Sequence, residues 1–242
     1  MKIVHISDLH VFSPNFVPEW GEKVIHMVNS LKPEILVVTG DLTDEGHQHE
    51  YEEAKAYLNR IKVENKIVVP GNHDARNEGY VLFEDIFKTR YPVYEDERVV
   101  ILGIDSSEPD IDEGHIGREI YDSIKQKLPE EEKIKILAMH HHLIPIPGTG
   151  RERYIPVDAG DALKLCVDTK VNFVLSGHKH KPWTWKLEDT YLITAGTATS
   201  RRLKGRSHPS YNVLEIEDRK ATLKEVNVTN QNLEQILSIA IT

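Results

Sequence analysis

The stretch KIVHISDLH, residues 2–10, begins with apolar and β-branched residues typical of a strand and ends in two polar side chains, Asp8 and His10. The same arrangement returns in EILVVTGD, residues 34–41, where a continuous apolar run ends in Asp41. Such an unbroken run is expected of a strand buried on both faces. Because α/β proteins place ligands at the carboxyl ends of their strands, we expect an α/β fold with its functional residues at these ends.

Strand and helix patterns alternate along the first 180 residues. Apolar runs predict strands at 2–7, 34–40, 66–71, 98–104, 135–140 and 172–177. Helices are predicted between them, at 19–31, 48–60, 79–89, 117–128 and 159–168.

The pattern changes after residue 180. Short runs with polar breaks predict antiparallel strands at 183–187, 191–196, 211–217 and 220–228. Residues 230–240 are predicted to form a short helix. We expect a single domain over 1–242, in which residues 1–180 carry the motifs and the strands within 181–228 complete the second sheet. The predicted architecture has two facing mixed sheets with helices on the outside.

Composition restricts the classes of function. The chain has 242 residues with 30 basic and 39 acidic side chains, and the net charge of −9 gives no electrostatic reason for nucleic-acid binding. The single cysteine, Cys166, excludes an internal disulfide and a cysteine-rich zinc site. No apolar run has the length needed to span a membrane, and the N-terminus lacks a secretory pattern. The sequence therefore predicts a cytoplasmic protein without a membrane partner.

Polar residues follow three more of the predicted strands. They form the groups Gly71-Asn72-His73-Asp74, His140-His141-His142 and Gly177-His178-Lys179-His180. In an extended chain, side chains two residues apart point to the same side, so Asp8 and His10 are expected to converge, as are His178 and His180. Imidazole and carboxylate ligands suit zinc, iron or manganese.

Charge counting refines the expected metal site. Asp8 and Asp41 supply two negative charges, whereas the histidines and Asn72 bind as neutral groups. Two divalent cations would therefore retain a surplus of positive charge that favours a phosphate ligand. Two metals about 3.5–4 Å apart activate water and neutralise charge on phosphorus oxygens. Asp41 is the best-placed carboxylate to bridge them.

The five groups together resemble the calcineurin-like metallophosphoesterase family. The pattern of that family is DxH, GD, GNH(D/E), a histidine after a later strand, and GHxH. Here the motifs run from residue 8 to residue 180 in the order of the family. One such motif alone is weak evidence, but five in order are specific.

The resemblance implies a role for each motif residue. It assigns the first metal to Asp8, His10 and His180, the second metal to Asn72, His140 and His178, and the bridge to Asp41. His73 would protonate the leaving oxygen, with Asp74 orienting its imidazole. A metal-bound hydroxide would attack phosphorus in line.

Several assignments near the expected site stay open. His140 is the expected ligand of its group and His141 the alternative; His141 would otherwise lie near the substrate, and His142 at the surface. Arg151 and Arg153 are candidates for contacts to a substrate phosphate, although two solvated arginines are the more ordinary interpretation. The basic stretch 201–206 follows a strand end and is a candidate to face the cleft, although a solvated loop is the more ordinary interpretation.

The expected activity is hydrolysis of a small phosphodiester by an enzyme with two metal ions, manganese, iron or zinc. A cyclic nucleotide or a glycerophosphodiester is the expected substrate, by analogy with compact family members. The alternatives are a phosphomonoesterase, a nuclease and, from another class, a non-catalytic scaffold. The oligomeric state is left open, with a dimer compatible with the sequence.

Overall fold

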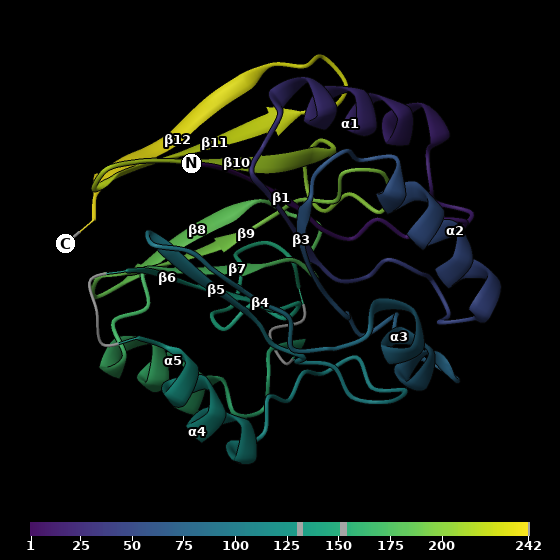
Figure 1. Ribbon diagram of the computed structural model, residues 1–242. Helices are drawn as coiled ribbons and strands as arrows, with labels where there is room; N and C mark the ends of the chain where they lie inside the picture. The colour runs from purple at the N-terminus through teal and green to yellow at the C-terminus, as the bar shows by residue number, and fades with distance from the viewer. Residues whose placement is uncertain (130–132, 151–153, 242) are drawn as a thin grey trace.

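The computed structural model describes residues 1–129, 133–150 and 154–241, and these ranges contain five helices and twelve strands (Figure 1). The helices are α1 (Pro18–Leu31), α2 (Gln48–Asn59), α3 (Gly79–Phe87), α4 (Arg118–Lys127) and α5 (Ala159–Asp168). The first seven strands are β1 (Lys2–Ile6), β2 (Ile35–Thr39), β3 (Asn65–Val69), β4 (Val93–Glu95), β5 (Val99–Gly103), β6 (Ile134–Ala138) and β7 (Phe173–Ser176). The last five are β8 (Trp183–Leu187), β9 (Thr190–Thr194), β10 (Ser210–Glu217), β11 (Lys220–Asn227) and β12 (Leu233–Ala240).

The strands form two six-stranded mixed sheets. The first has the order β12-β11-β10-β1-β2-β3, and the second has the order β4-β5-β6-β7-β9-β8. Helices α1 to α3 lie outside the first sheet, and α4 and α5 lie outside the second (Figure 1). This four-layer α/β/β/α arrangement confirms the predicted fold class.

Three apolar clusters hold the layers together, and the two-residue period of the strands decides which cluster each side chain joins. In β1, Val4 packs with the helices outside the first sheet. Its neighbour Ile3 instead joins the core between the sheets, where it meets Phe173 of β7 in the same cluster. The third cluster lies between the second sheet and helices α4 and α5, where Ile124 and Leu165 are buried.

The C-terminal region differs from its prediction in two ways. First, it is divided between the sheets: β8 and β9 extend the second sheet, with β9 parallel to β7, whereas β10 and β11 lie beside β1 in the first sheet. Second, the short helix expected at 230–240 is wrong, because this segment is strand β12. Leu237 and Ile239, two residues apart, pack toward the core between the sheets, and this period belongs to a strand.

The short edge strand β4, which pairs antiparallel with β5, was not predicted. Among the described residues, no helix has the length and apolar character required to cross a membrane.

Candidate metal centre

The predicted ligands do not lie on extended chain. Strands β1 and β7 end at Ile6 and Ser176, and the ligand residues follow in loops. Five of them adopt left-handed backbone, with φ between 45° and 73°: Asp8, His10, Asp41, His178 and His180. A positive φ costs a non-glycine residue about 1–3 kcal/mol and is typical of functional sites. The expectation that alternation along a strand directs these side chains is therefore wrong, because the turns direct them.

One group of donors gathers at the end of β1. The ligand atoms of Asp8, His10, Asp41 and His180 all lie within 4.8 Å of one another, and all four residues are buried. Nε2 of His180 lies 3.3 Å from Oδ1 of Asp8 and 3.2 Å from Nε2 of His10. Two imidazole nitrogens and a carboxylate oxygen thus face one point.

A second group lies beside the first. Oδ1 of Asn72 is 3.0 Å from Nε2 of His140 and 3.0 Å from Nδ1 of His178, and these two nitrogens are 3.2 Å apart. The His140 ring donates through Nδ1 to the carbonyl oxygen of Thr39 at 2.7 Å, which leaves Nε2 directed at the group. A backbone partner of this kind fixes the tautomer of a ligand histidine.

Asp41 lies between the two groups. Its Oδ1 is 3.4 Å from Nε2 of His140, and its Oδ2 is 3.7 Å from Nε2 of His10. The backbone N–H of His73 donates to Oδ1 at 3.0 Å and holds the carboxylate in place. A Cβ at Gly71 would lie 2.2 Å from the same oxygen, so only glycine leaves room for Asp41 here. The two oxygens of one carboxylate therefore face one group each.

The charge state differs between the donors. Burial opposes protonation of His140, but the Asp41 carboxylate outweighs it and raises the pKa of His140 to about 9, so this ring must lose its proton when a metal binds. Burial lowers the pKa of His10 to about 4 and holds the pKa of His178 well below its usual value, so both rings are neutral, as ligands must be. Burial favours the protonated form of Asp41, but His140 and His73 outweigh this and hold its pKa well below the usual value. The buried Asp41 carboxylate needs a positive charge beside it, and a metal ion supplies one when His140 is neutral. The donor set therefore fits two metal ions.

His73 stands at the edge of the two groups, but its partner is not Asp74. Nδ1 of His73 lies 2.6 Å from the carbonyl oxygen of Asp44 and 3.6 Å from its carboxylate. The Asp74 carboxylate is buried behind the site, where it accepts hydrogen bonds from the backbone of Leu42, Thr43 and Gly71. The expectation that Asp74 orients the His73 ring is therefore wrong.

The neighbours of His140 are placed differently from the prediction. The His141 ring is completely buried, with Nδ1 2.9 Å from Oγ of Ser106 and Nε2 3.2 Å from the carbonyl oxygen of Asp112. It therefore lies behind the site and not in contact with the cleft. His142 is also buried, against the expectation of a surface residue, and its ring stacks on that of His178 at 5.7 Å. The candidates Arg151 and Arg153 lie outside the described residues.

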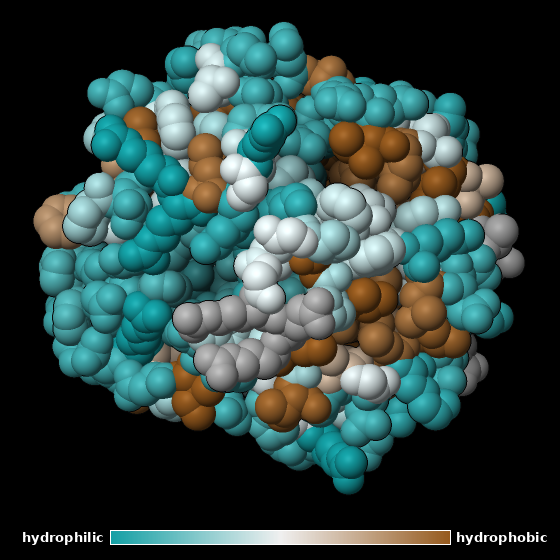
Figure 2. All heavy atoms as spheres, turned by 180° about the vertical axis from the view of Figure 1, so that it is seen from behind, coloured by the Kyte–Doolittle hydropathy of each residue, from teal (hydrophilic) through white to brown (hydrophobic). Residues whose placement is uncertain are grey.

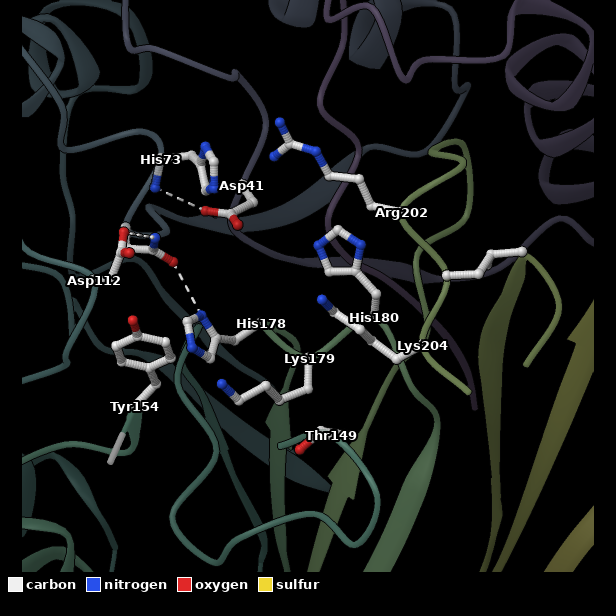
Figure 3. A pocket seen from close by; sticks show the side chains of 12 residues that line it. Asp41, His73, Asp112, Thr149, Tyr154, His178, Lys179, His180, Arg202 and Lys204 are labelled. Carbon is white, nitrogen blue, oxygen red and sulfur yellow. Dashed lines mark hydrogen bonds between the residues drawn. The ribbon is translucent and has the colours of Figure 1, made fainter. Parts of the chain in front are cut away.

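A pocket of about 590 Å³ opens over the two groups, a size that suits a small molecule. Figure 3 shows it, and Figure 2 shows that the surface around a hollow on the rear face is mostly hydrophilic. Its lining consists of Asp41, Asn72, His73, Asp112, Thr149, Tyr154, His178, Lys179, His180, Arg202, Leu203 and Lys204.

Sequence reasoning missed several residues at this site. One of them is Asp44, which lies three residues after the bridge candidate Asp41; this short spacing indicates that its carboxylate lies near the site. The stretch 201–206 is a loop with exposed residues, as expected, and the alternative also holds, because Arg202 and Lys204 line the pocket. Arg202 also forms an ion pair with Asp44 at 3.0 Å.

A comparison with known protein families agrees with this geometry. The model of the calcineurin-like phosphoesterase family matches residues 1–182, about three quarters of the chain. The chain belongs to this family. The matched range contains all seven donors of the two groups, and residues 183–242 lie outside it.

Individual relatives are distant. A probable cyclic nucleotide phosphodiesterase of Xenorhabdus bovienii is 26% identical over 204 residues, which cover 76% of this chain and 81% of that protein. The glycerophosphodiester phosphodiesterase GpdQ of Enterobacter lignolyticus is 27% identical over 200 residues, which cover 74% and 71% of the two chains. A dimetal phosphatase from Danio rerio has a similar fold, with a TM-score of 0.74 at 10% identity and coverage of 100% and 99%.

Proposed function

We propose that this protein is a phosphodiesterase that hydrolyses small phosphodiesters with two metal ions. The observation that carries the proposal is the position of Asp41, whose two carboxylate oxygens face separate donor groups at 3.4 Å and 3.7 Å. A single carboxylate arranged in this way is suited to bridge two cations. Manganese, iron and zinc all suit the nitrogen and oxygen donors.

Each donor group would hold one metal. The first would be bound by Asp8, His10 and His180, the second by Asn72, His140 and His178, with Asp41 shared by both. When bound, two metals activate water and neutralise charge on the phosphorus oxygens.

The residues of the chain itself carry the remaining steps. The His73 side chain lines the pocket and is positioned to donate a proton to the leaving oxygen from Nε2, because Nδ1 is directed at Asp44. The Asp44 carboxylate, 3.6 Å from Nδ1, would stabilise the positive ring that this donation requires.

The substrate class rests on the pocket and the relatives. A volume of about 590 Å³ accommodates a nucleotide-sized ester. The relatives described above include proteins named as phosphodiesterases for cyclic nucleotides and for glycerophosphodiesters. We also infer that the chain is one domain, since the core between the sheets contains residues from β1, β7 and β12.

The proposal is tested with protein stripped of metal by a chelator and then supplied with manganese, iron, zinc or no metal. Hydrolysis of bis-p-nitrophenyl phosphate is compared with that of p-nitrophenyl phosphate. Metal-dependent cleavage that favours the diester is the expected result. A preference for the monoester would indicate a phosphomonoesterase instead. Absence of cleavage of both esters with every metal would contradict the proposed phosphodiesterase activity.

A further inference from the structure

One segment contributes cationic side chains to the pocket from outside the range that the family model matches. Residues 201–206 read RRLKGR and lie beyond residue 182. Arg202, Leu203 and Lys204 line the pocket, and Figure 3 shows the Lys204 side chain reaching into it beside His180. The family motifs therefore do not describe this side of the pocket.

The residues just before this segment form hydrogen bonds to the loop after β1, which carries Asp8 and His10. The Thr197 hydroxyl donates to the carbonyl oxygen of Asp8 at 2.7 Å, and the Thr199 hydroxyl donates to that of Leu9 at 2.6 Å. Just after the segment, the Ser207 hydroxyl donates to the carbonyl oxygen of Lys204 at 2.7 Å. The first two bonds join the residues before the segment to the loop that carries Asp8, and the third closes a turn that contains Lys204.

The two cations of the segment differ in their surroundings. Arg202 is paired with Asp44 at 3.0 Å, so its charge is balanced within the protein. Asp112, on the opposite side of the pocket, is likewise paired with Arg76 at 3.1 Å. Lys204 is exposed, and among the described residues no carboxylate forms an ion pair with its ammonium group.

Lys179 also lines the pocket, but it has partners within the protein and is not counted as an available charge. Its Nζ lies 4.6 Å from the centre of the Tyr154 ring, and the residue is 5% exposed. With Asp8 and Asp41 as the carboxylates of the donor groups, two divalent cations would keep a positive surplus before Lys204 is counted. A diester with one negative charge does not balance this total.

We propose that Lys204 forms a subsite for a second phosphate group, so that the preferred substrate is a phosphodiester that carries a further phosphate. The inference rests on the proposed function, since it names the substrate class of the same site. A charge-assisted contact of this kind contributes roughly a factor of ten or more to recognition.

The test uses two esters that differ only in the second phosphate. They are the p-nitrophenyl ester of thymidine 5′-phosphate and the same ester with a 3′-phosphate, both assayed with the metal-loaded full chain. We expect kcat/KM to be about tenfold higher for the 3′-phosphorylated ester. Lys204→Gln should reduce this ratio toward one, and Lys204→Arg should restore it.

Arg206→Gln is the matched control, because Arg206 lies in the same exposed segment but does not line the pocket. It removes the same charge and should leave the ratio unchanged. A wild-type ratio near one, or a ratio equally reduced by Lys204→Gln and Arg206→Gln, would overturn the subsite.

Calorimetric binding provides a readout independent of turnover. Thymidine 3′,5′-bisphosphate should bind the metal-loaded protein about tenfold more tightly than thymidine 5′-phosphate, and Lys204→Gln should remove the difference. If neither ester is cleaved with any metal, the proposed function fails, and the binding comparison still decides the subsite. If the unphosphorylated ester is cleaved without a preference, only the subsite fails.

Discussion

The carbonyl oxygen of Asp44 lies 2.6 Å from Nδ1 of His73, and its carboxylate lies 3.4 Å from Nδ1 of His10. One residue therefore contacts both the proposed proton donor and a proposed metal ligand. Asp44 also forms an ion pair with Arg202, which lies more than 150 residues later in the sequence. Asp44 thus connects the donor groups, the proton donor and the pocket wall.

Replacement of His73 by alanine should affect esters according to their leaving group. Without a proton donor, esters of poor leaving groups should be hydrolysed about 10²–10⁴-fold more slowly, because the leaving oxygen must depart as an alkoxide. Nitrophenyl esters should lose far less, since nitrophenolate leaves without help. Steady-state rates on a methyl and a nitrophenyl diester check this, and an equal loss on both would exclude the proton-donor role.

Asp44→Asn should lower activity through the same histidine. The amide cannot stabilise a positive His73 ring, so we expect a loss of about tenfold or more on poor leaving groups. Glu45→Gln is the control, because the neighbouring Glu45 pairs with Arg76 near the surface. Rates with both variants on a methyl diester provide the measurement, and similar losses in the two would contradict a specific role for Asp44.

Asn72→Ala and His178→Ala should each abolish turnover while leaving the fold intact. Each removes a donor from the second group, where Oδ1 of Asn72 lies 3.0 Å from Nδ1 of His178. Metal content by elemental analysis should fall toward one ion per chain, with an unchanged circular dichroism spectrum. Full metal content together with full activity in either variant would remove that residue from the ligand set.

Gly177→Ala should weaken metal binding by steric overlap, without removing a ligand. A Cβ at this position would lie 1.8 Å from Oγ of Ser7 and 2.6 Å from Oδ2 of Asp8, so the Asp8 loop must move. We expect metal affinity to fall by about tenfold or more, the effect of displaced supporting groups around a metal. Gly160→Ala is the control, because its Cβ would meet no atom within 4 Å. Titration with manganese compares the two variants.

Asp74→Ala should act on stability. The buried carboxylate accepts bonds from the backbone N–H groups of Leu42, Thr43 and Gly71, and from the Thr43 hydroxyl. Leaving these donors without an acceptor should lower the free energy of unfolding by about 3–5 kcal/mol. Urea denaturation measures the change. Asp122→Ala, at a side chain that is 84% exposed, should change it by less than about 0.5 kcal/mol. Comparable losses in the two variants would contradict this account.

The sequence by itself predicted ten of the twelve strands in the described residues, the five helices and the polar groups that follow the strands. These are local properties: a buried strand is an unbroken apolar run, and motifs such as Asp8-Leu9-His10 are contiguous. The contiguous motif also placed His73 beside Asn72. It could not identify the partner of His73, because Asp74 is adjacent in sequence but directed away from the ring.

The tertiary structure alone decided how distant segments meet. Strand β12 forms because Leu237 lies opposite Leu223 of β11, a pairing that an isolated amphipathic segment does not reveal. Lys204 reaches the pocket because its segment is bound to the loop after β1, nearly 200 residues earlier. Contacts between residues so far apart depend on the packed sheets, and no local pattern in the chain encodes them.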